Sequence, residues 1–581
     1  MQLLLFLAIV VSLSSCVMAQ SEVYISAQTG GKDGSGTAAD PFDGSTQQKF
    51  DAVIARLGPS TNIHIGAGTF HTLGEASFKV HPNTKIRGAG MEVTRIIQDG
   101  TGKIHACVFS GAGGGIEIED LSIDCGYENQ QRVNGEVKCN AAAIGLYGSH
   151  LAVRRCMVSN YGSSSAECGE NFAVGIYQGA EADGENMVIE DCVFTGMSLL
   201  APGSSSVLTM SGGPLKNEVQ VPSWARGAVA RRNHFSGYSR GCHGITMSGC
   251  QGAIVEDNVF EHFMGCCVYQ DTWPMRDIVI RDNIMTDIDQ GIFLAGDNLD
   301  MVNFQIRGNI ILLHDGLDLK NITAGVANTA IPHSLAPGNM IMLRDLKIAG
   351  GSLKPDVPLF VTSVPSRTSF TFSATKDGKT DTTDSATGGF VQPLHYGGVM
   401  TPSPEGINVF TGGGERVHPL RNFLIDRNVI RPYSSDGKAR IASTGIRARG
   451  LENSQVVGNV VFDSGNHRGL VISSPKGLTS SVICRDNYGT DNTLALPRDD
   501  KGNLNTDILS DQGLARSEGF PAAPAEFNGR KLSHAVDGSG PARDHHFAGK
   551  PGDYAVEGDY LYIYTGDGAQ HQWKRIGMVD Y

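Results

Sequence analysis

Short runs of alternating apolar and polar residues fill the middle of the chain, and two phrases recur within them. The first phrase is Gly-apolar-x-apolar, which occurs at Gly244–Met247, Gly291–Leu294, Gly445–Ala448 and Gly469–Ile472. The second is an apolar alternation that ends in an asparagine, and its copies end at Asn233, Asn258, Asn283, Asn309, Asn428, Asn459 and Asn487. Where nothing is inserted, as between Asn258 and Asn309, the asparagine returns after 25 or 26 residues.

A period of this length indicates a stacked array of similar units. Each unit holds strands with a period of two and no helical period, so the sequence predicts an all-β solenoid of parallel strands, a parallel β-helix. Successive coils of such a solenoid lie about 4.8 Å apart. An asparagine at a fixed position of each coil is then expected to form a ladder, with each side-chain amide bonded to the next coil.

Breaks in the repeat predict the domain organisation. The phrase disappears between 321 and 405, where strand-like pieces and a polar stretch predict a small inserted β-domain. The composition turns polar and rich in Pro and Gly after 492, and aromatic strand-like runs return near the end. The predicted units are 20–60 as a cap region, 61–320 and 406–492 as the two parts of the solenoid, 321–405 as the insertion, 493–548 as a linker and 549–581 as a C-terminal β-hairpin module.

The first coils resemble the opening of the pectate-lyase-like superfamily. The resemblance lies in Ile65–Phe70 (IGAGTF), Ile86–Met91 (IRGAGM) and Thr94–Ile97 (TRII), and Asp33–Thr37 with Phe50–Val53 is similar to the cap region of such proteins. The resemblance implies a right-handed, single-stranded parallel β-helix whose cap helix shields the open edge of the first coil. It also implies an action on extracellular polysaccharide.

The first 19 residues predict export. An apolar run from Leu3 to Val11 is too short to span a bilayer, and Val17–Ala19 fits a cleavage site. Leu13–Cys16 also resembles a bacterial lipobox, which would leave Cys16 lipid-anchored, so a secreted protein and an outer-membrane lipoprotein both stay open. The net charge of −13 and the absence of a basic stripe exclude nucleic acid as an expected partner.

Twelve cysteines become eleven when the signal peptide is removed, so at least one thiol stays outside an intramolecular disulfide. No pair has zinc-binding spacing. Most are expected to stack inside the solenoid as small apolar residues. Cys156 and Cys192 occupy the same position of two coils, and either a disulfide or inert stacking is open for them.

The alternation predicts which residues face outward. With Ile245, Val268, Ile292, Leu317, Ile446 and Leu470 placed inward, the first outward stripe is Thr246, Tyr269, Phe293, Asp318 and Arg447. Two residues further along lies a second stripe of Ser248, Asp271, Ala295, Lys320 and Arg449. The turns that enter these strands contribute His243, Asp289, His314, Asp315 and Arg468. We expect Tyr269, Asp271, Asp289, Phe293, His314, Asp315, Asp318 and Lys320 to gather on one side.

Aromatic residues among carboxylates suit a sugar polymer, because sugar rings stack on aromatic faces while acids and bases act between them. The leading hypothesis is glycoside hydrolysis by two carboxylates drawn from Asp271, Asp289, Asp315 and Asp318. The candidate substrate-binding residues are Tyr177, Tyr269, Phe293, Arg447, Arg449 and Arg468.

Two short segments sharpen this hypothesis by resemblance. His314–Leu319 (HDGLDL) is similar to the Asp-Gly-Ile-Asp stretch of polygalacturonase-type hydrolases, which implies that Asp315 is the general acid. Cys242–Ile245 resembles the Gly-His-Gly-Ile motif of that family, which implies a role for His243. The two motifs occur here in the opposite order, and the paired Asp-Asp and the Arg-Ile-Lys of that family are absent.

Other functions stay open. A lyase on a uronic-acid polymer would need a base and a neutralised substrate carboxylate, the latter through Lys or Arg and often through Ca²⁺ held by acidic residues. Lys320 together with Asp271, Asp289 and Asp318 could supply these, and Arg447 and Arg449 could hold the substrate carboxylates. A glycan-binding adhesin and a tail-spike-like structural protein are the non-catalytic alternatives. His262 is expected to be a solvated or capping residue, and Asp257 and Asp282 to face outward in structural roles.

Overall fold

The computed structural model describes most of residues 21–495, together with the short strands that follow as far as residue 577. The longer gaps are 163–170, 178–183, 196–204, 213–222, 237–242, 395–403, 412–418, 434–439, 462–469 and 474–480. The predicted signal segment with Cys16, and the predicted site residues Asp271 and Arg468, lie outside the described residues. No helix in the described part is long and apolar enough to cross a bilayer.

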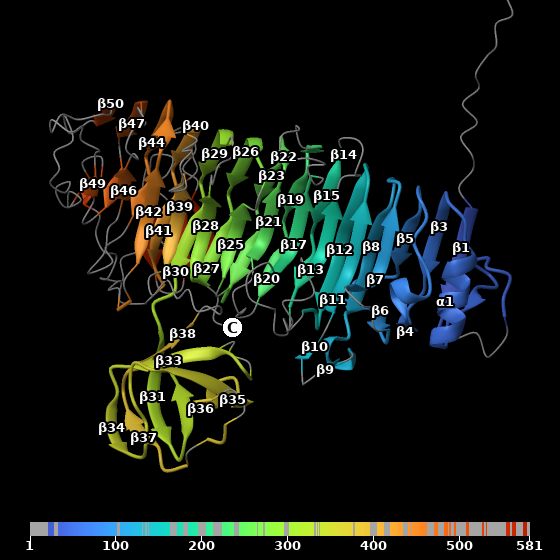
Figure 1. The fold of residues 1–581 in the computed structure, drawn as a ribbon, viewed down its shortest axis with the longest axis horizontal. Helices are drawn as coiled ribbons and strands as arrows, with labels where there is room; N and C mark the ends of the chain where they lie inside the picture. Colours follow the sequence, from blue (N-terminus) through green and yellow to red (C-terminus); the bar gives the residue numbers. More distant parts are fainter. Residues whose placement is uncertain are drawn as a thin grey trace, which may run out of the picture.

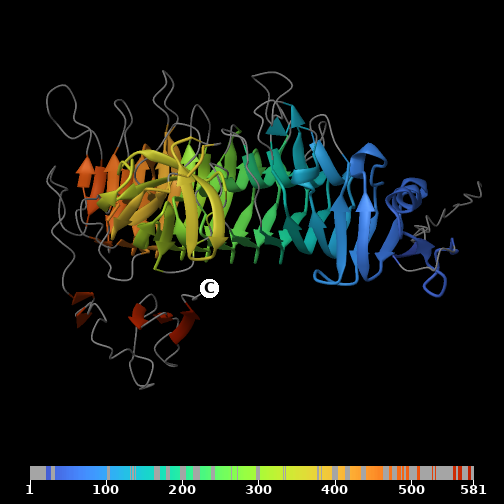
Figure 2. The ribbon, with the colours of Figure 1, turned by 90° about the horizontal axis from the view of Figure 1, so that it is seen from below.

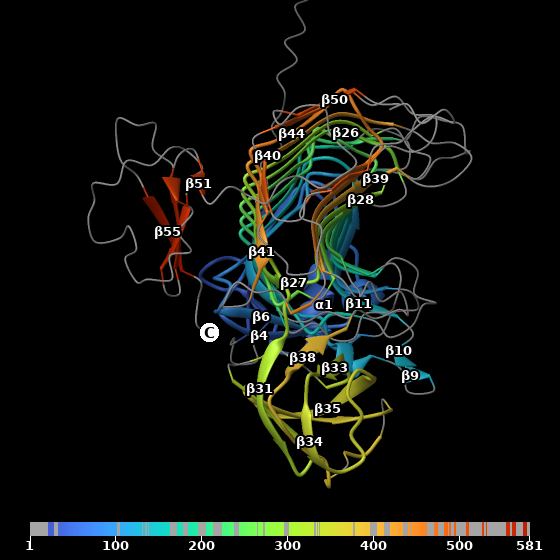
Figure 3. The same ribbon diagram turned by 90° about the vertical axis from the view of Figure 1, so that its left-hand side faces the viewer.

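The described chain winds as a right-handed parallel β-helix (Figure 1), as predicted. Viewed along the axis in Figure 3, the coils superpose so that strands such as β28 and β39 form one wall and β26, β40 and β44 another. The first wall, here face 1, is a parallel sheet of eleven strands. Its strands are β7 (His105–Ala112), β11 (Asn140–Tyr147), β13 (Asn171–Tyr177), β17 (Ser205–Ser211), β21 (His243–Ser248), β25 (Cys266–Gln270), β28 (Gln290–Ala295), β39 (Glu405–Phe410), β42 (Thr444–Arg449), β46 (Leu470–Ser473) and β49 (Thr493–Ala495).

Two further faces complete each coil and belong to one 29-stranded sheet. Face 2 contains β15 (Met187–Glu190), β19 (Val229–Arg231), β23 (Ile254–Glu256), β26 (Met275–Arg281), β29 (Met301–Arg307), β40 (Leu420–Asp426) and β44 (Ser454–Val457). Face 3 contains β16 (Val193–Phe194), β20 (His234–Ser236), β24 (Val259–Glu261), β27 (Ile284–Ile288), β30 (Ile310–Leu313), β41 (Val429–Pro432) and β45 (Val460–Val461). In earlier coils β8 (Glu117–Asp124) and β12 (Leu151–Ser159) run across both faces.

The predicted asparagine ladder is present at the corner between faces 2 and 3. Asn258 Nδ2 donates to Asn283 Oδ1 at 2.9 Å, and the same oxygen accepts the backbone N–H of Asn258 at 3.1 Å. The ladder continues past the insertion, because Asn309 Nδ2 donates to Asn428 Oδ1 at 2.9 Å. Each buried amide is therefore satisfied by its neighbour, which fixes the register of successive coils.

The residue before each ladder position turns the corner in the left-handed backbone region. Asp257 has φ +54° and Asp282 has φ +56°, a region that Asp and Asn tolerate better than most residues. Both side chains are exposed, so the predicted outward placement is confirmed.

The core is apolar and stacked like the ladder. The rings of Phe194, Phe235 and Phe260 follow one another with centroids 4.9 and 4.5 Å apart. Cys156 and Cys192 are both buried and neither forms a disulfide, so inert stacking describes that pair. At the N-terminal end, α1 (Gln47–Arg56) lies where the cap helix is expected and packs against β4 (Gly68–Thr72).

The insertion forms an eight-stranded antiparallel sheet that is attached at the corner between faces 3 and 1. It lies beside the C-terminal half of the solenoid (Figures 1 and 2). Its strands are β31 (Leu317–Thr323), β32 (Val326–Thr329), β33 (Met340–Arg344), β34 (Lys347–Gly350), β35 (Pro358–Ser366), β36 (Ser369–Ser373), β37 (Ser385–Thr387) and β38 (Phe390–Pro393). It has its own apolar core, which includes Ile341, Val361, Phe370 and Val391.

The insertion begins earlier than predicted. Leu317 lies in its core, whereas the face 1 position after Ile292 is Ile407 of β39. The solenoid also extends beyond 492, because β49 pairs with β46 and β50 (Asp507–Ser510) pairs with β47 (Ser481–Arg485), in parallel. A three-stranded antiparallel sheet of β53 (Tyr554–Glu557), β54 (Tyr560–Tyr564) and β55 (Trp573–Gly577) forms the C-terminal module.

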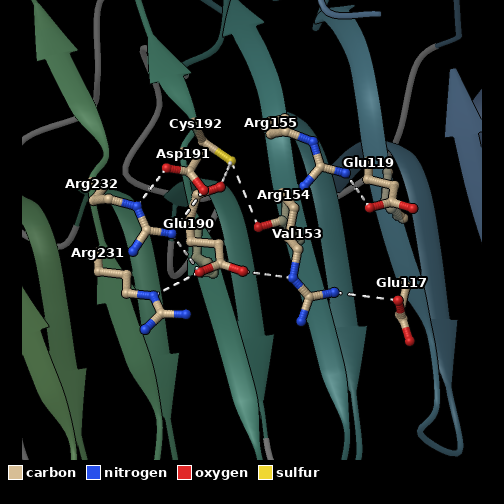
Figure 4. A network of polar contacts seen from close by, with 12 residues as sticks. Glu117, Glu119, Val153, Arg154, Arg155, Glu190, Asp191, Cys192, Arg231 and Arg232 are labelled. Atoms are coloured by element: carbon tan, nitrogen blue, oxygen red, sulfur yellow. Dashed lines mark hydrogen bonds and ion pairs between the residues drawn. The ribbon is translucent and has the colours of Figure 1, made fainter. Parts of the chain in front are cut away.

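The outer surface of face 2 carries a ladder of opposite charges (Figure 4). Glu190 accepts from Arg154 Nε at 2.7 Å on one side and from Arg231 Nε at 2.6 Å on the other. In the adjacent corner, Arg232 bonds both oxygens of Asp191 at 2.7 and 2.9 Å. Burial opposes the charge of Glu190, but these cations lower its pKa below the usual value.

Candidate functional site

Each strand of face 1 begins with an irregularity that decides which side chains point outward. Where β25 pairs with β28, Cys267 and Gly291 are not paired with each other, although the residues on both sides of them are. Gly291 and Gly406 are likewise left out of the pairing of β28 with β39. A Cβ atom at Gly291 would lie 2.3 Å from the Gly406 carbonyl oxygen and 3.1 Å from the Ile311 side chain. The glycine of the repeated phrase therefore faces the core, as Cys267 does.

This turn aims the preceding residue outward. Two adjacent outward stripes result, His243–Cys266–Gln290–Glu405–Thr444 and Thr246–Tyr269–Phe293–Asn408–Arg447. Both predicted stripes are wrong at one coil. Asp318 of the first stripe and Lys320 of the second lie on β31 of the inserted sheet, and Asn408 and Phe410 take their places on face 1. The physical reason is that the chain leaves the solenoid at Gly316, before the coil is complete.

Asp289 and Glu405 form a buried carboxyl pair on neighbouring coils. The backbone N–H of Glu405 donates to the Asp289 carbonyl at 2.9 Å, and the two residues are 8 % and 4 % exposed. Burial raises the pKa of Asp289 to about 7, with His314 opposing the rise and Glu405 adding to it. Asp289 Oδ2 has no hydrogen-bond partner among the described residues. A carboxyl in this state keeps its proton until the pH approaches neutrality, where its acid and base forms are about equally populated.

Glu405 differs from Asp289 because it has a cation beside it. Arg447 Nη1 lies 2.9 Å from Glu405 Oε1, and Asn408 Nδ2 donates to the other carboxylate oxygen. Burial raises the pKa of Glu405, while Arg447 and Asn408 oppose the rise. Of the two carboxyls, Glu405 is therefore the one whose ionised form is stabilised. Asn408 Oδ1 is buried without a partner in the described part.

Sequence reasoning placed Asp289 and Arg447 correctly on this side but missed Glu405 and Asn408. Both lie in Glu405–Val409 (EGINV), which carries the Gly-apolar-x-apolar phrase. That phrase was the available signal.

His314 reaches a second buried carboxylate instead of the outer surface. Its Nδ1 hydrogen-bonds Asp287 Oδ1, and Asp287 Oδ2 lies 2.8 Å from His262 Nδ1. The side chains of Asp287 and His314 are 1 % and 2 % exposed. His262, expected to be solvated or capping, is thus the partner of a buried acid, and Asp287 is a further residue that the pattern did not reveal.

The Asp-Gly-x-Asp segment secures the inserted sheet. Asp315 Oδ1 accepts the backbone N–H groups of Arg440 and Ile441 at 2.6 and 3.0 Å, and the Arg440 guanidinium pairs with Asp318. A Cβ atom at Gly316 (φ +92°) would meet the Phe390 ring at 2.3 Å, so only glycine allows this packing. Asp315 is 2 % exposed. Its geometry favours a clamp at the base of the insertion over the general acid implied by resemblance.

An aromatic ladder runs along the outer surface of face 1 beside the carboxyl pair. The rings of His243 and Tyr269 stack at 3.7 Å, Tyr269 and Phe293 at 5.7 Å, and Phe410 meets Phe293 edge-on at 5.3 Å. All four rings are half-buried. The structure therefore brings His243, Tyr269 and Phe293 together with Asp289, as predicted from the stripes.

The remaining predicted site residues lie elsewhere. Tyr177 lies on β13 of face 1, four strands from β28. It is buried, and its ring stacks on that of Tyr147 with the centroids 5.0 Å apart. Arg449 is exposed on β42, in register with Phe410. Lys320 is exposed on the insertion. Asp318 also lies on the insertion and is therefore separated from Asp289. Within the described residues, no three His, Cys, Asp or Glu side chains are grouped so that they could hold a metal ion.

The chain has distant likenesses among solved structures. No family model and no curated protein matches the chain. Among solved structures, it is similar to the catalytic unit of a GH87 α-1,3-glucanase from Streptomyces thermodiastaticus strain HF3-3, with 12 % identity over 84 % of this chain and 68 % of that one and a TM-score of 0.44. A family 28 exopolygalacturonase of Yersinia enterocolitica is 10 % identical over 86 % of this chain and 79 % of that one, with a TM-score of 0.38.

The A-module of the mannuronan C-5 epimerase AlgE4 from Azotobacter vinelandii is 13 % identical over 86 % of this chain and 99 % of that one, with a TM-score of 0.30. The parallel β-helix of this chain rests on its own strand pairings. At these TM-scores, the likenesses add nothing about the reaction.

Proposed function

We propose that the protein is a glycoside hydrolase that cleaves an extracellular polysaccharide with Asp289 and Glu405. The supporting observation is the contrast between two buried carboxyls on neighbouring coils. In the described part no cation is bonded to Asp289, whose pKa burial raises to about 7, whereas Glu405 is paired with Arg447. Environments that separate the protonation of two neighbouring carboxyls assign one as acid and the other as base or nucleophile.

In this mechanism Asp289 is the general acid. It holds a proton near neutral pH and delivers it to the glycosidic oxygen as that bond breaks. Its Oδ2, which has no partner in the described part, is the atom that carries the proton.

Glu405 acts opposite this acid, either attacking the anomeric carbon or removing a proton from the attacking water. Arg447 favours its ionised form against burial, and Asn408 orients one carboxylate oxygen. The unpartnered Oδ1 of Asn408 is a hydrogen-bond acceptor for a sugar hydroxyl. The half-buried rings of Tyr269 and Phe293 supply the stacking surface for the sugar.

The test is a panel of neutral glucans and uronic-acid polymers, with reducing ends and the absorbance of unsaturated uronates followed together. We expect reducing ends to appear without absorbance. Asp289→Asn and Glu405→Gln should each lower the rate by about 10²- to 10⁴-fold, because each removes one partner of the acid–base pair.

Asp257→Asn is the matched control, because Asp257 is exposed at a distant corner with φ +54°, which Asn also tolerates. Its rate should equal that of the wild type. Absorbance together with reducing ends would instead identify a lyase, and neither signal across the panel would favour a glycan-binding protein. Full activity of Asp289→Asn would remove Asp289 from the mechanism.

A further inference from the structure

The corner that enters β28 contains a fully buried carboxylate that the proposed chemistry does not use. Asp287 has φ +53°, and the pairing of β27 with β30 shifts register at this residue. The side chain, 1 % exposed, lies between His262 of the preceding coil and His314 of the following one. Burying a charge is costly unless it is paired and hydrogen-bonded, so this arrangement needs a reason.

The hydrogen bonds assign the proton positions. Gly316 N–H donates to His314 Nε2 at 3.2 Å, so this nitrogen is the acceptor and His314 carries its proton on Nδ1, which donates to Asp287. The other Asp287 oxygen lies 2.8 Å from His262 Nδ1. His262, Asp287 and His314 thus form a continuous buried chain whose inner end adjoins Asp289.

The charges along this chain balance. Burial works against the ionised form of Asp287, but His314 and His262 hold its pKa well below the usual value. Burial works against the cation at His262, yet Asp287 raises the pKa of this imidazole, helped by the nearby Glu261. Glu261 is itself paired with His234, 3.0 Å away. The groups that face Asp289 are His314, Glu405 and the buried Cys266 thiol.

We propose that His262, Asp287 and His314 are positioning residues that hold the titration of Asp289 near neutral pH, because the His262 cation offsets the Asp287 anion, with His262 as the end that responds to solvent. The His262 side chain is 21 % exposed, whereas the other two are almost inaccessible. Loss of the His262 cation removes a charge that offsets the Asp287 anion close to Asp289, and a like charge disfavours ionisation of that carboxyl. This inference rests on the proposed function for its catalytic meaning but not for its test.

The experiment follows the carboxyl carbon of Asp289 by NMR in ¹³C-aspartate-labelled protein, with Asp289→Asn identifying the signal. In the wild type we expect a titration midpoint near pH 7. In His262→Gln the midpoint should move upward by about one pH unit. The double variant His262→Gln/Asp287→Asn removes both charges and should return the midpoint to within about 0.3 pH units of the wild type.

His71→Gln is the control, since His71 forms a surface pair with Asp99 at 2.8 Å on a distant coil. Its Asp289 midpoint should be that of the wild type. An unchanged midpoint in His262→Gln, or the same shift in the double variant, overturns the inference even if the enzyme is active.

Catalysis supplies a separate readout. If polysaccharide is cleaved, the alkaline limb of kcat should move with the Asp289 midpoint in each variant. If the midpoint shifts as expected but no polysaccharide is cleaved, the coupling stands and the proposed function fails.

Discussion

The outer surfaces of faces 1 and 2 are built on the same coils at the same spacing, but they treat charge in opposite ways. On face 2 a single register position alternates in sign through seven coils, as Arg87, Glu119, Arg154, Glu190, Arg231, Glu256 and Arg281. Each has an opposite partner on a neighbouring coil. On face 1, Asp289 is buried beside another acid, and no cation is bonded to it in the described part.

The difference separates a structural surface from a chemical one. Ion pairs whose arginine stays exposed, as on face 2, contribute little to stability. A buried carboxyl that faces a second carboxyl costs stability. Asp289 is therefore a residue that selection for stability alone would not favour, and perturbed acids of this kind gather at functional sites.

The largest effect is expected at Asp289, and it depends on pH. Its pKa is about 7 in the folded protein against an ordinary 3.8, so folding favours the protonated form. The associated stability is complete below about pH 4 and is lost as the pH rises through 7. About three pH units at about 1.4 kcal/mol each give a loss of about 4 kcal/mol.

Asp289→Asn removes this dependence, so its advantage over the wild type should grow between pH 4 and 8. Urea unfolding at a series of pH values measures it. If the free energies of unfolding of the wild type and of Asp289→Asn change in parallel over this pH range, Asp289 ionises as an ordinary surface acid. The contrast between the two faces would then disappear.

The fold was predictable because its signals repeat. One asparagine at one position of each coil, from Asn233 to Asn487, carries both the period and the reason for it, since the amide must bond to the next coil. The site was predictable only where the chain stays in the coil, as at Asp289, Tyr269 and Arg447. The prediction misplaced Asp318 because it continued the period of 25 residues beyond Gly316. At Gly316 the chain packs against Phe390 and leaves the solenoid, so the next residues do not belong to the coil.

A smaller loss of stability is expected when a fully paired buried polar residue is removed. Asn283 donates to Val255 O at 3.0 Å and to Asn309 Oδ1 at 2.9 Å, and its own oxygen accepts two bonds from Asn258. Asn283→Ala removes the acceptor of the buried Asn258 backbone N–H and leaves Asn258 Nδ2 bonded to Ala230 O alone, so unfolding should become easier by about 2–3 kcal/mol.

The measurement is the urea midpoint at an unchanged slope. The neighbouring Asp282→Asn, exposed and in the left-handed region, should change stability by less than about 0.5 kcal/mol. At high pH, Asp289→Asn should raise the free energy of unfolding, whereas Asn283→Ala should lower it. These opposite changes would distinguish the unpaired polar residue from the paired one. Equal losses would show that burial alone, whatever the partner, decides the cost.

The smallest effect is expected on the charge ladder of face 2. Arg231 is 38 % exposed in its side chain, and Glu190 keeps bonds to Arg154 and Arg232 when Arg231 is replaced. Arg231→Gln should therefore cost less than about 1 kcal/mol and leave turnover unchanged. A double-mutant cycle with Glu190→Gln should give a coupling of about 0.2–1 kcal/mol that shrinks in high salt. A coupling of several kcal/mol that does not change with salt concentration would mean that the charge ladder is shielded from water. Face 2 would then have to be covered by a partner.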